Sequence, residues 1–369
     1  MQQNMIGSYG PWATSLLGEG PGSLSFRNNK FNDVEAWRAE ATSRFLELLA
    51  QSDTGSTPLV SVLDSAIEDD LEIQLLSWRL PYGPPTEALF LKPKGARGKL
   101  PGALALHDHA GNKYFGWQKI TKFKTPHPLM VEHQNQYYSG RAWANELARR
   151  GYAVLVPDTF PFASRRVLPS DYPADQVPPL LRDTHGEEKA DSIAYITAYN
   201  AWAAEHESIM AKALFCAGTT WPGVFLAEDR VALDILCNRD DVDAERGISC
   251  CGLSGGGMRT NFLAGIDPRI SCAVSVGMLS TWRDFLLHKA WTHTWMIYVP
   301  QLPRYFDYAE ILGLRVPLPS LVLNNRHDEL FTLSEMERGS SMLADMYKKA
   351  GASDNFQASF HDGPHKFDS

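Results

Sequence analysis

The stretch Ile248–Met258, which reads ISCCGLSGGGM, decides the fold of this 369-residue chain. Its first six residues form a mostly apolar run that is typical of a strand, and a helical pattern follows from Gly255. Between them, Gly252, Ser254 and Gly256 occupy the fixed positions of a G-x-S-x-G pentapeptide. A sharp strand-to-helix turn crowds its neighbours, and glycines leave the necessary room. The pattern therefore predicts an exposed serine hydroxyl at the end of a buried strand.

Ser254 would stand at the amino end of the following helix, where the helix dipole favours a developing negative charge. The structural alternative is a glycine-rich helix start at which the serine only caps the helix. The strand before the serine and the helix after it favour the first interpretation. We therefore predict that Ser254 is a nucleophile, which at neutral pH needs a base to take its proton.

An acid and a histidine follow Ser254 along the chain in the order that a catalytic triad of this kind requires. Asp328 and His365 each come shortly after an apolar, strand-like run. Because the carboxyl ends of parallel strands meet at one edge of a sheet, both side chains can converge on Ser254. We predict His365 as the base, in preference to His361, and Asp328 as the orienting acid, with Glu329 as the alternative.

Attack by the serine generates an oxyanion, which two hydrogen-bond donors have to stabilise. We expect one donor from the backbone N–H of Gly255, directly after the nucleophile. We expect the other from loop 107–112, which reads HDHAGN and contains small residues that let the backbone approach a substrate. Within this loop we predict the backbone N–H of His109, with Ala110 as the next choice.

His107 and His109 have a second interpretation as metal ligands, because they stand two residues apart after a strand. The acid and histidine of a dinuclear site do not follow them, since Gly111 and Asn112 occupy those positions. The glycine run around Ser254 also lacks the lysine of a phosphate-binding loop. We therefore expect neither a metal nor a cofactor.

Strands and helices alternate along most of the chain, which predicts an α/β protein with a mostly parallel sheet and helices on both faces. Continuous apolar runs indicate strands that are buried on both faces. The expected strands span residues 71–80, 86–93, 100–106, 152–156, 248–253, 270–279, 318–323 and 356–360. The expected helices span residues 33–49, 141–150, 191–238 with a break near 221–223, 255–264 and 333–350.

The domain organisation follows from where this alternation begins and where it is interrupted. We expect residues 1–70 to form an arm and a helix packed on the core, and residues 71–369 to form one catalytic domain. Two stretches that follow strands, about 159–188 and 280–314, are expected to be inserted cap segments that shape a substrate pocket. Aromatic faces stack on sugar rings, although they also fill helical cores. From the second insert we predict Trp282, Trp291 and Trp295 as substrate-binding residues, with His288, His293 and Arg304 as further polar contacts.

The composition is that of a globular protein, since 44% of the residues are hydrophobic and 21% are charged. The net charge of −8 favours neither nucleic acid nor an anionic membrane as a partner. Five cysteines without a C-x-x-C spacing, and the lack of a signal peptide pattern, lead us to expect a cytoplasmic protein. No apolar run reaches the length of a membrane-spanning helix. The apolar inserts are compatible with a homo-oligomer.

Five segments together resemble the α/β-hydrolases related to dienelactone hydrolases and acetyl xylan esterases. They are 107–113 (HDHAGNK), Asp158, 252–257 (GLSGGG), 263–270 (LAGIDPRI) and 363–365 (GPH). The resemblance covers roughly residues 70–369 and implies an α/β-hydrolase fold, no cofactor, and ester hydrolysis through an acyl-enzyme. The chain departs from the family at one point, because His-Gly usually follows the third strand and His107-Asp108 stands here.

Together, the residues and the resemblance predict a serine esterase acting on small acyl esters of carbohydrates or glycosides. A peptidase, an amidase or a lactone hydrolase on the same fold is the alternative enzyme. Residues 1–70 are too few for the large extra domain with which peptidases of this fold exclude folded proteins. A non-catalytic binding protein is a third alternative, which the complete set of Ser254, Asp328 and His365 disfavours.

Overall fold

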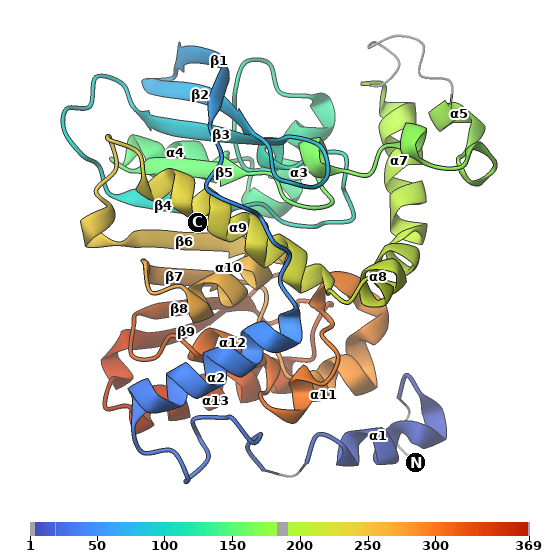
Figure 1. Ribbon diagram of the computed structural model, residues 1–369, viewed down its shortest axis with the longest axis vertical. Coiled ribbons are helices and arrows are strands. Elements are labelled where there is room, and N and C mark those ends of the chain that lie inside the picture. The colour runs from blue at the N-terminus through green and yellow to red at the C-terminus, as the bar shows by residue number, and fades with distance from the viewer. Residues whose placement is uncertain (1–3, 19, 183–190, 368–369) are drawn as a thin grey trace.

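The computed structural model describes residues 4–18, 20–182 and 191–367, so residues 183–188 of the first expected insert lie outside it. Helices cover both faces of a central nine-stranded sheet (Figure 1). The strands are β1 (Ser61–Glu68), β2 (Leu71–Trp78), β3 (Thr86–Pro93), β4 (Gly102–Leu106), β5 (Ala153–Pro157), β6 (Ile248–Leu253), β7 (Ile270–Val276), β8 (Ser320–Asn325) and β9 (Phe356–His361). The longer helices are α2 (Val34–Leu49), α3 (Pro128–Tyr138), α4 (Trp143–Arg149), α7 (Ile193–Glu205), α8 (Glu207–Cys216), α9 (Trp221–Cys237), α10 (Gly255–Ile266) and α13 (Leu333–Lys349). The shorter ones include α1 (Gly10–Ser15), α5 (Pro179–Arg182), α11 (Trp282–Asp284) and α12 (Tyr308–Gly313).

The strands lie in the order β1-β2-β3-β5-β4-β6-β7-β8-β9. Neighbours from β1 to β5 are antiparallel, and neighbours from β5 through β4 to β9 are parallel. Each of the eight strands expected from the sequence is present within a few residues of its expected bounds. The predicted fold class, a mostly parallel sheet with helices on both faces, is therefore confirmed.

Several elements lie where the sequence predicted none, and strand β1 and helix α3 are the largest of them. Strand β1 falls within residues 1–70, which we expected to hold only an arm and a helix, and it pairs antiparallel with β2. Most of its side chains are exposed because it forms the edge of the sheet, so no apolar alternation marks it. Helix α3 turns His133 and Gln134 inward, and these buried polar side chains conceal its helical periodicity.

Two hydrophobic cores lie on the two faces of the sheet. In β4, Leu104 and Leu106 point into a large core that also contains Phe45 of α2 and Phe262 of α10. The alternate residues of β4 point into a smaller core under α3 and α4. Because both faces are covered, the central strands β4 and β5 are apolar at every position, as expected for a parallel sheet.

The helical region expected at 191–238 is divided into α7, α8 and α9. Thr220 caps α9 by accepting a hydrogen bond from the backbone N–H of Gly223, where the sequence predicted a break. Among the described residues, no single helix is long and apolar enough to cross a membrane, and α8 and α9 pass that test only as a pair bent by 86°. In Figure 1, α7 and α8 extend to one side of the sheet.

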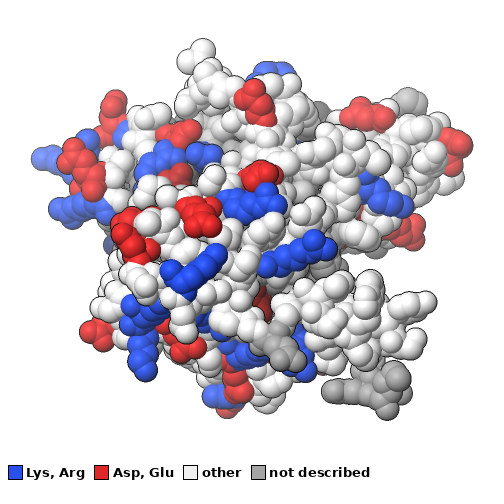
Figure 2. All heavy atoms as spheres, turned by 60° about the horizontal axis from the view of Figure 1, so that its bottom comes forward, with Lys and Arg blue, Asp and Glu red and all other residues white. Residues whose placement is uncertain are grey.

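Basic and acidic side chains are interspersed on the face of the molecule that Figure 2 shows. Several ion pairs of the described residues are exposed, such as Lys122 with Asp69 at 3.0 Å. Pairs of this kind contribute at most about 1 kcal/mol each to stability. Exposed pairs of this kind therefore contribute little to stability, in contrast to the buried pairs described below.

The topology brings the candidate residues to one edge of the sheet. Parallel strands β4, β6, β8 and β9 all end at the same side, because their neighbours in the sheet share one direction. His109 follows β4, Ser254 follows β6, Asp328 follows β8 and His365 follows β9. Ligands of open α/β sheets bind at this carboxyl edge.

Candidate active site

Ser254 occupies the turn between β6 and α10 with φ +56° and ψ −118°, a conformation that residues other than glycine rarely adopt. A Cβ atom on Gly252 would lie 2.5 Å from the carbonyl carbon of Gly256, and one on Gly256 would lie 2.1 Å from the carbonyl oxygen of Leu106. Neither position therefore has room for a side chain. The backbone N–H of Ser254 donates to the carbonyl of Val276 in β7 at 2.8 Å, which attaches the turn to the neighbouring strand.

His365 is held by Asp328, the acid that the sequence favoured. His365 Nδ1 lies 2.6 Å from Asp328 Oδ2, and Asp328 is buried. The second carboxylate oxygen of Asp328 accepts the backbone N–H of Leu330 at 2.9 Å, which fixes the carboxylate. The alternatives Glu329 and His361 are both exposed. Because Nδ1 donates to the carboxylate, the imidazole keeps Nε2 free of a proton, as a general base requires.

Ser254 and His365 line the same cavity. Nε2 of His365 is buried and has no hydrogen-bond partner among the described residues, so the Ser254 hydroxyl does not bond to it in this structure. Hydrogen bonds between a nucleophile and its base are often long without substrate and tighten when substrate binds. The structure thus brings together all three predicted triad residues, but the hydrogen bond between the Ser254 hydroxyl and His365 Nε2 is not formed.

The two expected oxyanion donors are adjacent. A Cβ atom on Gly255 would lie 2.9 Å from the backbone nitrogen of His109. Gly255 is the first residue of α10, and the first N–H groups of a helix have no acceptor within the helix. Ala110 has φ +42° and also lines the cavity. The backbone nitrogens of Gly255 and His109 therefore lie close together beside Ser254, as the prediction of two oxyanion donors requires.

Lys119 supports this oxyanion loop from behind. Its side chain is fully buried, and Nζ donates to the carbonyl oxygens of Asp108 at 2.7 Å and His109 at 3.0 Å. In a trans peptide the N–H points opposite to the C=O, so holding these two carbonyls directs the N–H groups of His109 and Ala110 the other way. Burial lowers the pKa of Lys119 to about 8, and the nearby Asp108 carboxylate opposes this. The lysine thus adds positive charge next to the oxyanion site.

Asp108, which stands where the resembling family usually has glycine, connects the loop to α3. Its Oδ1 atom accepts hydrogen bonds from the Tyr138 hydroxyl at 2.5 Å and from His133 Nε2 at 3.1 Å. Burial alone would raise the pKa of the Asp108 carboxyl, but the charges of His133 and Lys119 and these hydrogen bonds hold it well below its usual range. A carboxylate at this position therefore braces the loop instead of disturbing it.

A cavity of about 400 Å³ opens in front of Ser254. Much of its wall is apolar and includes Met258, Ile297 and Leu330, while Tyr137 and Glu207 are polar. The full lining consists of His109, Ala110, Gly111, Tyr137, Ala204, Glu207, Ser254, Gly255, Met258, Met278, Thr292, His293, Thr294, Ile297, Leu330 and His365. Apolar walls with a few polar groups are typical of small-molecule sites.

His293 is the one predicted polar contact of the second insert that reaches this cavity. Its Nε2 atom bonds to the carbonyl of Leu330 at 2.9 Å, and its ring contacts Phe285 and Phe331. Burial lowers the pKa of His293 to about 4. The imidazole is therefore neutral near pH 7 and adds no charge beside Ser254.

The three tryptophans predicted to bind substrate do not line this cavity. Trp282 is only 4% exposed, and its indole N–H donates to the carbonyl of Phe306 at 3.0 Å, so it belongs to the core. Trp291 and Trp295 are 73% and 40% exposed. The insert folds into short helices, and it presents Thr292, His293, Thr294 and Ile297 to the cavity instead. Among residues 159–182, the described part of the first insert, none lines it.

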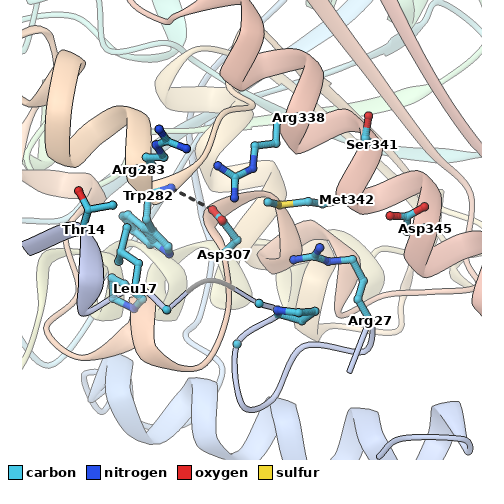
Figure 3. Close-up of a pocket in the computed structure, with 15 residues that line it drawn as sticks. Thr14, Leu17, Arg27, Trp282, Arg283, Asp307, Arg338, Ser341, Met342 and Asp345 are labelled. Carbon is cyan, nitrogen blue, oxygen red and sulfur yellow. Dashed lines mark hydrogen bonds between the residues drawn. The ribbon is translucent and has the colours of Figure 1, made fainter. Parts of the chain in front are cut away.

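Trp282 lines a different cavity of about 540 Å³ between the amino-terminal arm and α13 (Figure 3). Its backbone N–H donates to Asp307 Oδ1 at 2.9 Å, and Arg338 points toward the same carboxylate. Burial raises the pKa of Asp307 to about 6. None of the predicted triad residues lines this second cavity, so the candidate chemistry stays at Ser254.

Within the described part of the chain, no three histidine, cysteine, aspartate or glutamate side chains group as metal ligands. His107 is buried, and its Nδ1 atom faces the carbonyl of Asp108 at 3.0 Å. His109 Nδ1 accepts the backbone N–H of Gly111, and its Nε2 faces Glu207. Both ring nitrogens of His109 are therefore engaged within the protein, whereas Nε2 of His107 is buried without a hydrogen-bond partner among the described residues.

Sequence reasoning missed three residues of the site: Lys119, Tyr137 and Glu207. Lys119 ends a 3-10 helix of three residues, Trp117–Lys119, and Tyr137 belongs to the unpredicted helix α3. Glu207 begins α8, more than 40 residues before the nucleophile, and no motif surrounds it. Only the folding of these segments over the sheet edge shows their place. Glu205 and His206 stand directly before Glu207, so its charge did not single it out in the sequence either.

The sheet order, the strained serine turn and the position of the acid and histidine define the α/β-hydrolase fold, which this chain has. Solved structures of esterases share this fold. One from Bacteroides fragilis NCTC 9343, provisionally described as an acetyl xylan esterase, superimposes with a TM-score of 0.68 over 97% of this chain and 82% of its own, at 16% identity. The glucuronoyl esterase from Solibacter usitatus has a TM-score of 0.57 over 94% and 93% of the two chains, at 13% identity.

In sequence, the chain is similar to YtaP of Bacillus subtilis (strain 168), whose name assigns it provisionally to the hydrolases. The two are 26% identical over 277 residues, which is 73% of this chain and 74% of YtaP. No family model matches the chain. The chain is thus similar to a hydrolase in sequence and shares its fold with esterases.

Proposed function

We propose that this protein is a serine hydrolase that cleaves carboxylic esters through an acyl-enzyme. The observation that carries the proposal is the Asp328–His365 pair at 2.6 Å, facing a strained serine in the same cavity. A serine turn alone is compatible with a structural role. A buried carboxylate, a histidine with a free Nε2 and two adjacent backbone donors have no evident structural use together.

Each step of acyl transfer has a residue available in this arrangement. His365 takes the proton of Ser254 at Nε2 as the hydroxyl attacks the ester carbonyl, and Asp328 stabilises the imidazolium. The backbone N–H groups of Gly255 and His109 stabilise the oxyanion. His365 then gives the proton to the leaving alcohol and later activates the water that releases the acyl group.

For the substrate, we propose small acyl esters of carbohydrates or glycosides. A cavity of about 400 Å³ is at the lower end of the volumes found for small-molecule sites. The acetyl xylan esterase and glucuronoyl esterase descriptions of the similar structures support an ester of a carbohydrate. The polar wall at Tyr137 and Glu207 is compatible with hydroxyl groups on such a substrate.

The test is hydrolysis of 4-nitrophenyl esters, from acetate to octanoate, by the wild type and by Ser254→Ala. We expect the variant to lose activity by about 10⁴-fold or more, since the attacking atom is absent. Ser341→Ala, which removes an exposed hydroxyl on α13, is the matched control and should retain full activity. Equal activity of Ser254→Ala and wild type, or no labelling of the wild type by a fluorophosphonate, would refute the proposal.

A further inference from the structure

One carboxylate that ester hydrolysis does not use lies in the cavity wall beside the oxyanion loop. Glu207, the first residue of α8, lines the cavity that contains Ser254 and His109. Its Oε1 atom is occupied, because it lies 2.9 Å from His109 Nε2 and 2.5 Å from Lys113 Nζ. Among the described residues, its Oε2 atom has one long contact, 3.4 Å to the backbone N–H of Trp295. This second oxygen keeps capacity for another hydrogen bond.

The setting keeps Glu207 ionised. Burial alone would raise the pKa of its carboxyl, but the hydrogen bond from His109 and the charge of Lys113 hold it well below its usual range. Lys113 is itself buried, so its ammonium stays with this carboxylate. An ionised carboxylate only accepts hydrogen bonds. Any group that pairs with Glu207 in the cavity must therefore carry an O–H or N–H donor.

The wall around Glu207 is largely apolar, with Ala204, Met258 and Ile297 among its members. In such a wall a single charged acceptor decides which ligands bind. An apolar ligand would displace the water that bonds to the Glu207 carboxylate and would leave the carboxylate without a replacement hydrogen bond. His109 connects Glu207 directly to the oxyanion loop. A group bound at Glu207 consequently lies next to the reacting ester.

We infer that Glu207 binds a hydroxyl group of the substrate and thereby selects esters of polyhydroxy compounds over esters of similar size without hydroxyls. This inference rests on the proposed ester hydrolysis at Ser254 and specifies its substrate class. Sites built to bond a substrate hydroxyl reject the analogue that lacks it far more strongly than apolar pockets reject a change in size.

The test compares matched ester pairs in a pH-stat. One pair differs in the alcohol, 1-acetylglycerol against propyl acetate, and the other in the acyl group, methyl lactate against methyl propanoate. We expect the wild type to prefer the hydroxyl-bearing ester of at least one pair by about tenfold or more in kcat/KM. Glu207→Gln should reduce this preference about tenfold, since a neutral amide is a weaker acceptor. Glu205→Gln, an exposed carboxylate at the end of α7, is the matched control and should keep the preference.

The ratio within a pair separates substrate binding from structural support. Losing the contact between Glu207 and His109 would slow both esters of a pair equally and leave their ratio unchanged. An unchanged ratio in Glu207→Gln, or a wild type without preference in either pair, overturns the inference. The proposed function fails separately, if 4-nitrophenyl acetate hydrolysis does not depend on Ser254.

Inhibition of the wild type gives a second test if Glu207→Gln does not fold. Methyl glucoside and cyclohexylmethanol are six-membered rings with and without several hydroxyl groups. If Glu207 binds substrate hydroxyls, methyl glucoside should inhibit 4-nitrophenyl acetate hydrolysis competitively. The concentration needed should be about tenfold lower than that of cyclohexylmethanol. Equal or weaker inhibition by methyl glucoside would contradict the inference.

Discussion

Ser254 holds a backbone conformation that is expected to cost about 1–3 kcal/mol, and its surroundings impose it. The glycines at 252 and 256 allow the turn to form, and the hydrogen bond from Ser254 to Val276 attaches it to β7. On the other side of the cavity, Asp328 holds His365 in the tautomer that leaves Nε2 free. The reactivity that we propose for Ser254 therefore depends on residues that do not touch the substrate.

The pairing of Asp328 with His365 leads to a prediction for two neighbouring acids. Asp328→Asn should lower kcat for 4-nitrophenyl acetate by about 10³- to 10⁴-fold, because an amide at this position favours the wrong imidazole tautomer. Glu329→Gln is the matched control, since Glu329 is exposed and adjacent in sequence, and it should stay within about threefold of the wild type. Steady-state kinetics of both variants check this. A larger loss in Glu329→Gln than in Asp328→Asn would reverse the assignment of the acid.

At the scale of elements, the site is assembled from loops that leave the carboxyl ends of four strands. The loop after β4 is the most elaborate, because Lys119 holds two of its carbonyls and Asp108 joins it to α3. This buried charge network replaces the glycine that usually follows the histidine in the resembling family. A longer side chain is tolerated at residue 108 because α3 supplies Tyr138 and His133 as its partners.

Removal of Lys119 tests whether this loop positions the oxyanion donors. Lys119→Met should lower kcat about 10- to 100-fold with a smaller change in KM, because the loss acts on the transition state. Lys122→Met, an exposed lysine of the same loop, is the control and should leave kcat unchanged. Activity equal to the wild type in Lys119→Met would show that the loop holds its shape without the lysine.

The pH profile separates the charge of Lys119 from its hydrogen bonds. Since the pKa of Lys119 is about 8, its amino group loses the positive charge as the pH rises through 8. The neutral amine keeps two N–H donors, so wild-type kcat should fall only partly above pH 8. The kcat of Lys119→Met should be low both below and above pH 8 and should not decline as the pH rises through 8. If kcat declined equally above pH 8 in the wild type and in Lys119→Met, the titrating group would be one other than Lys119.

At the scale of the whole molecule, the amino-terminal arm packs on the core and contacts the last third of the chain. Leu24 and Phe26 of the amino-terminal arm join the large core, and the indole N–H of Trp37 donates to the carbonyl of Leu24 at 2.7 Å. Glu310, at the start of α12, is fully buried and accepts hydrogen bonds from Ser25 and Arg27 of the arm. The arm is thus attached to the second insert itself, which contains Glu310.

The ion pair of Arg27 with Glu310 supports a prediction about stability. Arg27→Ala should lower the free energy of unfolding by about 2–3 kcal/mol, because it leaves the Glu310 carboxylate buried with fewer partners. Arg27 is only 18% exposed and Glu310 is not exposed at all. Arg246→Ala, which removes an arginine side chain that is 78% exposed beside Asp243, should change stability by about 0.5 kcal/mol or less. Urea unfolding of both variants checks this, and equal effects would show that the arm is not held by the pair.

The sequence by itself determined the elements that repeat a periodic pattern and the residues that belong to a local motif. The eight expected strands and the Ser254 turn followed from apolar runs and glycine spacing, because burial on both faces leaves a continuous signal along the chain. The exposed edge strand β1 and the helix α3, with its polar inward face, carry no such signal. The order of acid and histidine after the serine indicated Asp328 and His365, but left Glu329 open.

Tertiary structure decided which side chains meet. It placed Asp328 rather than Glu329 against His365, moved Trp282 into the core, and brought Lys119 and Glu207 to the oxyanion loop from segments 10 and 98 residues away from His109. The physical reason is that contacts of this kind depend on how loops cross the edge of the sheet, and neighbours along the chain do not record that path. The partners of a buried charge beside this site are distant from it in sequence, so its role can be recognised only in the folded chain.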